Sequence, residues 1–188
     1  MEQFQLNDEL IMKIAGLISA KKNSNLKKLV KDIHFADMAD VINLLSENQG
    51  IYLIKLFDSE KTSEILTELD ENVREKILKA LSVKEIADEI EELDSDDAAD
   101  ILAELSEERK EEVISEISNE DLADNLIELL SYKEDSAGGL MAKELVKANE
   151  NWTILKCLGE IKKQGENVTR VHSIYVVDDK ERLIGRLS

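Results

Sequence analysis

The chain has 188 residues, of which 43% are hydrophobic and 35% are charged, enough apolar side chain for the core of one full domain and part of a second. Its 42 acidic and 24 basic residues give a formal net charge of −18, which argues against nucleic acid and anionic membrane surfaces as partners because phosphates repel an acidic protein. The single cysteine, Cys157, excludes an internal disulfide, and no apolar stretch reaches the ~20 residues that cross a bilayer, so we expect a chain that is soluble on its own and forms no pore.

Two helices are expected before residue 34. Asn7 has the side chain of a helix N-cap, so a first helix is predicted over about residues 8–20. Asn23-Ser24 is expected to interrupt it. A second helix then carries the apolar residues Leu26, Leu29, Val30 and Ile33. We interpret this lysine-rich segment as the solvated terminal cap of the helices that follow, with docking to an acidic neighbour as the alternative.

From residue 46 onward, residues that cap helices recur at a fixed interval. Ser and Asp accept hydrogen bonds from the free N–H groups of a first helical turn, so they mark helix starts. They stand twelve residues apart at Ser46, Asp58, Asp70, Ser82, Asp94, Ser106 and Ser118. Ser82 and Glu85 also have the spacing of a capping box. The interval predicts a succession of short helices.

Apolar residues keep the same interval. One series reads Ile42, Ile54, Leu66, Leu78, Ile90, Leu102, Ile114 and Leu126. A second series, three residues later, reads Leu45, Phe57, Leu69, Leu81, Leu93, Leu105, Ile117 and Leu129. A separation of three residues places both series on one helical face. Twelve residues make about 3.3 turns, so a continuous helix would rotate this face off the core, and separate helices joined by tight turns are expected.

The expected fold class is therefore mainly α, with a superhelical array of short helix hairpins over residues 1–130. Short amphipathic helices bury their apolar faces only when they stack on neighbours. Paired as hairpins, the helices repeat every 24 residues, and Ala-Asp pairs recur at Ala39-Asp40, Ala87-Asp88, Ala99-Asp100 and Ala123-Asp124. A compact bundle of unequal helices is the alternative, and it fits so regular a period less well.

The repeat stops after Leu130, and residues 131–142 are interpreted as a junction. They contain Gly138 and Gly139, the only paired glycines of the chain. Paired glycines permit positive φ angles and leave backbone carbonyls accessible. A helix end and a domain boundary are therefore expected here.

Residues 143–188 change to a mixed pattern. A helix is predicted from Trp152 to Ile161, followed by a β-rich run from Val171 to Val177. Asp178-Asp179-Lys180 is expected to turn the chain into a returning strand from Arg182 to Leu187. The resulting strand–helix–strand–strand order is typical of an α/β domain. Because the pattern stops on a strand, we interpret this domain as incomplete.

No constellation of catalytic residues is visible in the sequence. His34 and His172 are remote from each other, and neither has the spacing of a zinc site. Cys157 has apolar neighbours in its predicted helix, so a packed thiol is expected rather than a nucleophile. The chain also contains no glycine-rich phosphate-binding loop. We therefore expect that it is not an enzyme.

Oxygen ligands are abundant instead. Seventeen acidic residues lie within residues 85–121, against two basic ones. Asp96 and Asp100 are separated by one helical turn, about 6 Å along the axis. If Ala98 and Leu102 face the core, both aspartates lie on the opposite side and face solvent or a partner. Mg²⁺ and Ca²⁺ prefer such carboxylates, and Mg²⁺ commonly keeps several of its waters.

A solvated surface is the alternative interpretation of these acids. The position that Asp100 occupies in the repeat is also acidic at Asp40, Glu64, Asp88, Glu112 and Asp124. A recurring acid is what the exposed face of any acidic helical array presents. The residues alone are compatible with both interpretations of these acids, cation binding and simple solvation.

Three stretches resemble the cytosolic part of the MgtE family of magnesium channels. They are Ile33-His34-x-x-Asp37-x-Ala39-Asp40, Glu92-Leu93-x-x-Asp96-Asp97-x-Ala99-Asp100-x-Leu102 and Tyr132-x-x-Asp135-x-Ala137-Gly138-Gly139-Leu140-Met141. The run from His172 to Gly185 is similar to the start of that family's first CBS domain. The resemblance covers about residues 26–188.

The resemblance implies an α-superhelical N domain, two CBS domains and a membrane pore, which work as a homodimer with this region on the cytoplasmic side. The implied partners are the family's own CBS and transmembrane domains. Mg²⁺ is the implied ligand, held between the N domain and the CBS domains, where it favours the closed pore. By motif, the implied metal residues are Asp96, Asp100, Glu64 and Gly139, the last through its backbone carbonyl.

A function of another class is also compatible with the helical repeat. The chain would then be a metal-independent module that binds a protein partner, comparable to the flagellar rotor switch proteins. Such a module would present a partner groove and would not respond to cations.

Overall fold

The computed structural model describes residues 6–164 and 173–187. The chain forms two compact units, one made of Met1–Leu93 with Asp100–Asp124 and the other of Asp94–Ala99 with Asn125–Ser188. Within the described ranges, every helix is too short or too polar to span a lipid bilayer.

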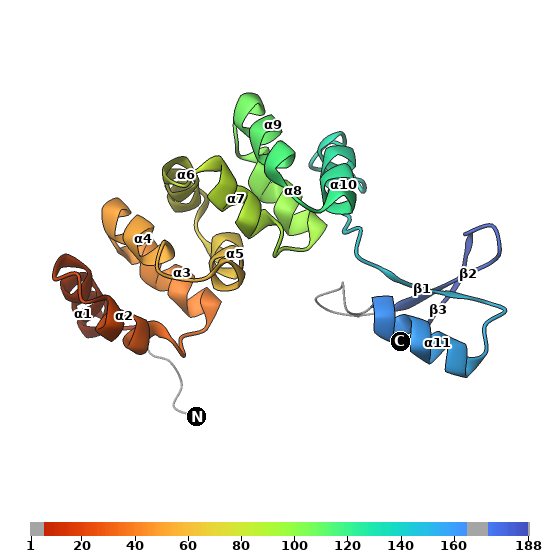
Figure 1. The fold of residues 1–188 in the computed structure, drawn as a ribbon, viewed down its shortest axis with the longest axis horizontal. Helices are drawn as coiled ribbons and strands as arrows, with labels where there is room; N and C mark the ends of the chain where they lie inside the picture. Colours follow the sequence, from red (N-terminus) through yellow and green to blue (C-terminus); the bar gives the residue numbers. More distant parts are fainter. Residues whose placement is uncertain (1–5, 165–172, 188) are drawn as a thin grey trace. The chain divides into compact units, whose positions relative to one another are not determined.

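Ten helices lie between Asp8 and Leu130 in the described part of the chain (Figure 1). They are α1 (Asp8–Ser19), α2 (Asn23–Val30), α3 (Phe35–Leu44), α4 (Glu47–Ile54), α5 (Ser59–Glu68), α6 (Glu71–Ala80), α7 (Val83–Ile90), α8 (Ser95–Ala103), α9 (Glu107–Glu116) and α10 (Glu120–Leu130). From α3 onward each has 8 to 11 residues. The prediction of short, separate helices is therefore confirmed.

The start of the first helix is confirmed, but the break after it is not where it was expected. Asn7 caps α1, and its Oδ1 accepts the Leu10 N–H at 2.8 Å. The chain turns at Lys21, whose φ of 51° lies in the left-handed region. Asn23 is already the first residue of α2. The lysine pair therefore makes the turn, and the expected break at Asn23-Ser24 is wrong by two residues.

Most of the predicted helix starts are confirmed, although the side chains of Asp70 and Ser106 make no capping hydrogen bond. Helices follow directly on Ser46, Asp58, Asp70, Ser82 and Ser106, and α8 starts next to Asp94. Ser82 and Glu85 form the predicted capping box, in which the Glu85 carboxylate accepts the Ser82 N–H at 2.7 Å.

The predicted cap at Ser118 is wrong by one residue. Helix α10 begins at Glu120, and Oδ1 of Asn119 accepts the Leu122 N–H at 3.2 Å. The Ser118 and Asn119 N–H groups both donate to the Glu91 carboxylate, which holds this turn one residue out of phase with the others.

The two apolar series form the core of the helical unit. In the first series every residue is buried except Ile114, which is half-buried. In the second series the buried members are Leu69, Leu81, Ile117 and Leu129. Helix α3 packs on α5, α5 on α7, α7 on α9, and α4 on α6. This contact between every second helix is the stacking that a hairpin array requires, so the predicted fold class is confirmed.

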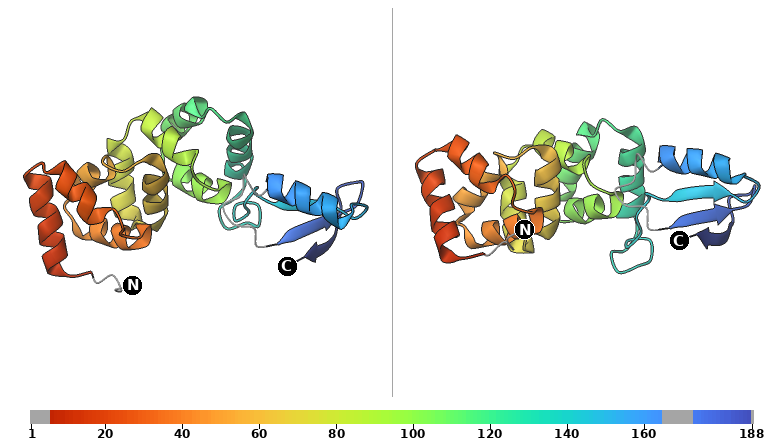
Figure 2. Two further views of the ribbon diagram at one scale, coloured as in Figure 1. Left: turned by 60° about the horizontal axis from the view of Figure 1, so that its bottom comes forward. Right: turned by 90° about the horizontal axis from the view of Figure 1, so that it is seen from below.

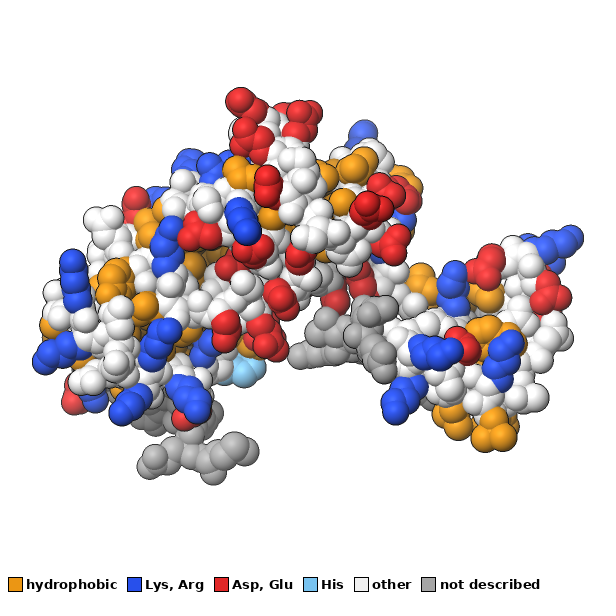
Figure 3. Space-filling view, in the orientation of Figure 1, with side chains coloured by type: hydrophobic (Ala, Val, Ile, Leu, Met, Phe, Trp, Pro, Cys, Tyr) orange, Lys and Arg blue, Asp and Glu red, His pale blue; other side chains and the backbone are white. Residues whose placement is uncertain are grey.

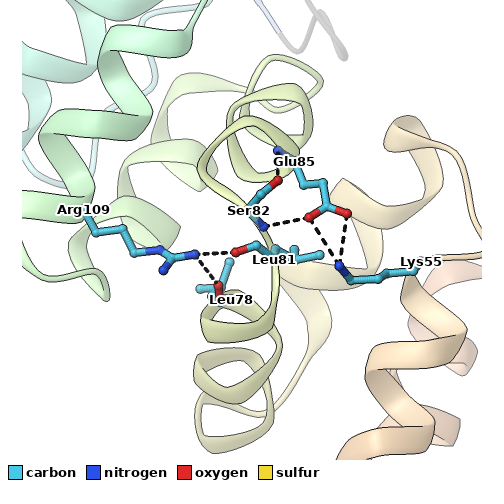
Figure 4. A network of polar contacts seen from close by, with 6 residues as sticks. All are labelled: Lys55, Leu78, Leu81, Ser82, Glu85 and Arg109. Carbon is cyan, nitrogen blue, oxygen red and sulfur yellow. Dashed lines mark hydrogen bonds and ion pairs between the residues drawn. The ribbon is translucent and has the colours of Figure 1, made fainter.

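Three basic side chains bind the carbonyl groups that end helices elsewhere in the unit. The Lys61 ammonium donates to the carbonyls of Val30 and Ile33 at 3.1 and 3.0 Å, after the end of α2. Arg74 reaches carbonyls near the end of α5 and pairs with Glu104. Arg109 of α9 donates to carbonyls at the end of α6 (Figure 4). A cation at a helix C-terminus satisfies free carbonyls and the helix dipole together.

The second unit contains a small mixed sheet. Its elements are β1 (Val146–Asn149), α11 (Ile154–Gln164), β2 (Ile174–Val177) and β3 (Leu183–Leu187). Strands β1 and β2 are parallel, β2 and β3 are antiparallel, and α11 packs against β1 (Figure 2). The predicted strand–helix–strand–strand order is confirmed. A parallel β-α-β crossover followed by a hairpin is the local arrangement that this order produces.

Details of this unit differ from the prediction. Helix α11 starts at Ile154 rather than Trp152, because Oγ1 of Thr153 accepts the Lys156 N–H at 3.3 Å and caps the helix there. Cys157, expected to be packed, is half-buried. The predicted strand positions at Val171 and His172 lie outside the described residues.

Candidate cation-binding surface

Negative charge is concentrated in one part of the helical unit. Residues 85–124, from α7 to α10, contain 18 acidic and two basic residues, a net charge of −16. Residues 1–84 contain 14 acidic and 12 basic residues, a net charge of −2. In Figure 3 acidic side chains gather over α9 and α10, and lysines over α1 and α2. The first candidate for cation binding is therefore the surface of α7–α10.

The recurring acid of the repeat lies on an exposed face. Asp40, Glu64, Asp88 and Glu112 are all exposed, one on each of the stacked helices α3, α5, α7 and α9. Asp100 and Asp124 are exposed as well. The periodicity itself is therefore explained by solvation, and it does not single out a cation site.

Asp96 and Asp100 lie on α8 at the predicted separation of one turn. Ala98 and Leu102 are 0% exposed, so they form the core side of this helix as expected. Asp100 is exposed, whereas Asp96, in the first helical turn, is half-buried. Two carboxylates one turn apart on a helix fit a Mg²⁺ ion that keeps most of its waters and takes one or two protein ligands.

The first turn of α8 is held by residues that sequence reasoning missed. Ser95 is 0% exposed, and both its N–H and its hydroxyl donate to Oε2 of Glu144, at 3.1 and 2.8 Å. The Lys143 N–H donates to Oγ of Ser95 at 2.9 Å. These hydrogen bonds join residues that are 48 and 49 positions apart in the sequence, so no local sequence motif predicts them.

Glu64 lies near the Lys61 ammonium as well as near other carboxylates. It shares the lining of an open cavity of about 430 Å³ with Asp58, Lys61 and His34. Burial lowers the pKa of Lys61 below its usual value, and the negative charges of Asp58, Asp32 and Glu64 oppose that effect. The positive charge of Lys61 close to Glu64 opposes the approach of a metal cation, and the metal role of Glu64 stays a prediction.

Gly139 belongs to a tight loop whose backbone leaves no room for a side chain. A Cβ atom there would lie 2.4 Å from the carbonyl oxygen of Lys133. A Cβ atom on Gly138 would lie 2.5 Å from the ring of Tyr132. No described glycine has a positive φ. A close neighbour rather than a positive φ therefore explains both glycines: the backbone of Lys133 and Glu134 for Gly139, and the ring of Tyr132 for Gly138.

The described residues hold no group of three or more His, Cys, Asp or Glu side chains close enough to bind a metal ion together. The predicted metal residues Asp96, Asp100 and Glu64 are therefore not gathered into one cluster. Asp96 and Asp100 lie as a pair on α8, and their metal role stays a prediction.

A buried carboxyl group on α7 also escaped sequence reasoning. Glu89 is 9% exposed, and its Oε2 has no hydrogen-bond partner among the described residues. Burial, with the nearby charges of Asp88 and Glu92, raises the pKa of Glu89 to about 8. Its side chain is therefore mostly uncharged at neutral pH. In sequence it is one of many glutamates, and nothing marks it as buried.

Comparison with known proteins identifies both parts of the chain. The sequence model of the MgtE intracellular N domain matches residues 33–135, and that of the CBS domain matches residues 137–188. The magnesium transporter MgtE of Thermus thermophilus is 42% identical over 57 residues, which are 30% of this chain and 13% of that protein. The match thus covers a small part of the length of this curated relative.

Two solved structures share the fold. One is the cytosolic domain of the Mg²⁺ channel MgtE in complex with ATP, with a TM-score of 0.84 and 26% identity, covering 95% of this chain and 73% of that one. The other is the soluble part of a magnesium transporter, with a TM-score of 0.78 and 21% identity, covering 96% and 71%. Because the N-domain model spans more than half of its residues, this chain belongs to the MgtE intracellular N domain family.

Proposed function

We propose that this chain is the cytosolic, magnesium-sensing regulatory region of a magnesium transporter or channel. Mg²⁺ ions bind its acidic surface and bridge it to a CBS domain, which favours the closed pore. The chain works within a homodimer, beside CBS and transmembrane domains of the same protein. Membership of the MgtE N domain family and the match of residues 137–188 to the CBS domain support this role.

The observation that carries the proposal is the charge of −16 on residues 85–124. Two unit charges 4 Å apart repel by about 4 kcal/mol at an effective dielectric constant near 20. Divalent ions between acidic surfaces reverse the sign of that interaction. Docking of two such surfaces then depends on the concentration of free Mg²⁺.

Several bound ions are needed for a switch. One weak site with free Mg²⁺ at ten times its Kd contributes about 1.4 kcal/mol. Moving a two-state equilibrium from 1:99 to 99:1 takes about 5.5 kcal/mol. Asp96 and Asp100 supply part of one Mg²⁺ site. The remaining acidic residues of α7–α10 supply ligands for further Mg²⁺ sites. The ligands on the CBS side would complete the coordination of each ion.

The experiment that tests this role compares two pairs of acids in the 188-residue chain. Isothermal titration with Mg²⁺ in 100 mM KCl is expected to give millimolar binding that Asp96→Ala with Asp100→Ala weakens. Glu71→Ala with Glu75→Ala is the control, because both residues are exposed, one turn apart on α6 and outside residues 85–124, and remove the same charge.

Equal weakening by the two double variants would mean that only overall charge matters. No heat of Mg²⁺ binding to the unsubstituted chain would contradict the sensing role and favour a metal-independent interaction module. The family match favours the first function.

A further inference from the structure

We propose that Ser95 and Glu144 are positioning residues for the cation site on α8. Their hydrogen bonds join the first turn of that helix, which carries Asp96, to the segment that leads into β1. We call the contact of Ser95 with Glu144 and Lys143 the latch. Cation binding at Asp96 and the packing of that segment are thereby coupled. This inference rests on the proposed function and adds the route by which a bound ion acts on the C-terminal unit.

The latch has a buried serine at its centre and half-buried residues around it, and its hydrogen bonds are mutually consistent. The hydroxyl of Ser95, 0% exposed, donates to Glu144 at 2.8 Å and accepts from the Lys143 N–H at 2.9 Å. The Ser95 N–H, at the start of α8, donates to the same oxygen of Glu144 at 3.1 Å. A carboxylate at a helix N-terminus is stabilised by the free N–H groups and by the helix dipole. Glu144 therefore brings to the start of α8 a hydrogen-bond acceptor from 49 residues away in the sequence.

A second contact holds the same segment. The Lys143 ammonium lies 2.6 Å from Oε1 of Glu128 on α10, and this ion pair lowers the pKa of Glu128. The Tyr132 hydroxyl donates to the same oxygen at 3.3 Å. Residues 143 and 144 are thus tied to two helices immediately before β1 begins at Val146. Movement of the first turn of α8 therefore has to strain or break these bonds.

Coupling follows from the position of Asp96 next to Ser95 in the chain. Asp96 and Glu144 are both negative near one helix end, so a cation at Asp96 relieves their mutual repulsion. The latch in turn fixes the backbone from which the Asp96 side chain extends. By thermodynamic linkage, an ion that tightens the latch is bound more tightly when the latch is intact.

Ser95→Ala in the complete chain tests the coupling without changing its charge. We expect Mg²⁺ binding to weaken about fivefold or more. We also expect Mg²⁺ to slow amide hydrogen exchange at residues 143–149 in the unsubstituted chain and not in this variant. Ser115→Ala on α9 is the control, because that hydroxyl donates only to a carbonyl of its own helix, at 2.7 Å.

Glu144→Gln and Glu150→Gln separate the latch from overall charge. Both remove one negative charge from the C-terminal unit, and Glu150 is exposed. We expect Glu144→Gln to weaken Mg²⁺ binding more than Glu150→Gln does. A Ser95→Ala protein that melts earlier but binds Mg²⁺ as before, with the same exchange response at 143–149, would overturn the coupling and leave the proposed function intact. Absence of any Mg²⁺ response in the unsubstituted chain would overturn both.

Discussion

Residues 33–84 and residues 85–124 are built on the same repeat and share one kind of core, yet their surfaces differ. The repeat positions Ile42, Ile54, Leu66 and Leu78 of the first region and Ile90 and Leu102 of the second are all at most 2% exposed, and Ile114 of the second is half-buried. The first region has ten acidic and six basic residues, a net charge of −4, against −16 for the second. The apolar repeat therefore sets the fold in both regions, and charge alone distinguishes the region to which we assign cation binding.

The largest effect is expected from the shared core. Leu66→Ala in α5 and Leu102→Ala in α8 each remove a side chain that is at most 1% exposed, so each should lower the free energy of unfolding by about 2–5 kcal/mol. Urea denaturation in 100 mM salt measures both. Leu44→Ala, at a position that is 61% exposed, should stay within about 0.5 kcal/mol of the unsubstituted chain. A loss confined to one of the two core variants would mean that the two regions do not share one kind of core.

A smaller effect on the free energy of unfolding, which depends on pH and is present only in the acidic region, is expected at Glu89. Its pKa is about 8 in the folded chain and near 4.5 when unfolded, so the unfolded state loses its proton first as pH rises. Its contribution to stability is therefore present below pH 4.5 and is lost as pH rises towards 8. Each pKa unit corresponds to about 1.4 kcal/mol, so the loss amounts to a few kcal/mol.

Glu89→Gln removes this group without changing its shape. The difference in unfolding free energy between the variant and the unsubstituted chain should grow in favour of Gln from pH 5 to pH 8, as followed by urea denaturation. A difference that is constant over this range would mean that Glu89 does not titrate as the fold implies.

The smallest effect concerns the turn before α10, where the twelve-residue spacing of caps is broken. Asn119→Ala removes the side chain that caps α10 and should cost about 0.5–2 kcal/mol. Ser118→Ala should cost less, because its backbone rather than its side chain binds Glu91. Thermal melts of the two variants compare their losses of stability directly. An equal loss would mean that the Ser118 side chain caps α10, as the sequence predicted.

Features encoded by neighbouring residues were predictable from the sequence. The caps at Ser46 and Ser82, the buried apolar series and the hairpin after Asp178 all follow from spacings no longer than one repeat of twelve residues. The error at Ser118 has a distant cause, since Glu91 binds that turn from 27 residues away. The latch between Ser95 and Glu144 and the burial of Glu89 also depend on tertiary contacts. The domain boundaries at 130 and 143 and the metal roles of Asp96, Asp100, Glu64 and Gly139 stay predictions.

The central claim is that divalent cations bind mainly to the acidic region of residues 85–124. Nuclear magnetic resonance of the ¹⁵N-labelled chain, titrated with Mg²⁺ in 100 mM KCl, tests it residue by residue. We predict saturable shifts of the amides of α8, centred on Asp96 and Asp100, with small changes in residues 33–84. Shifts spread evenly over both regions, or none at millimolar Mg²⁺, would contradict the account.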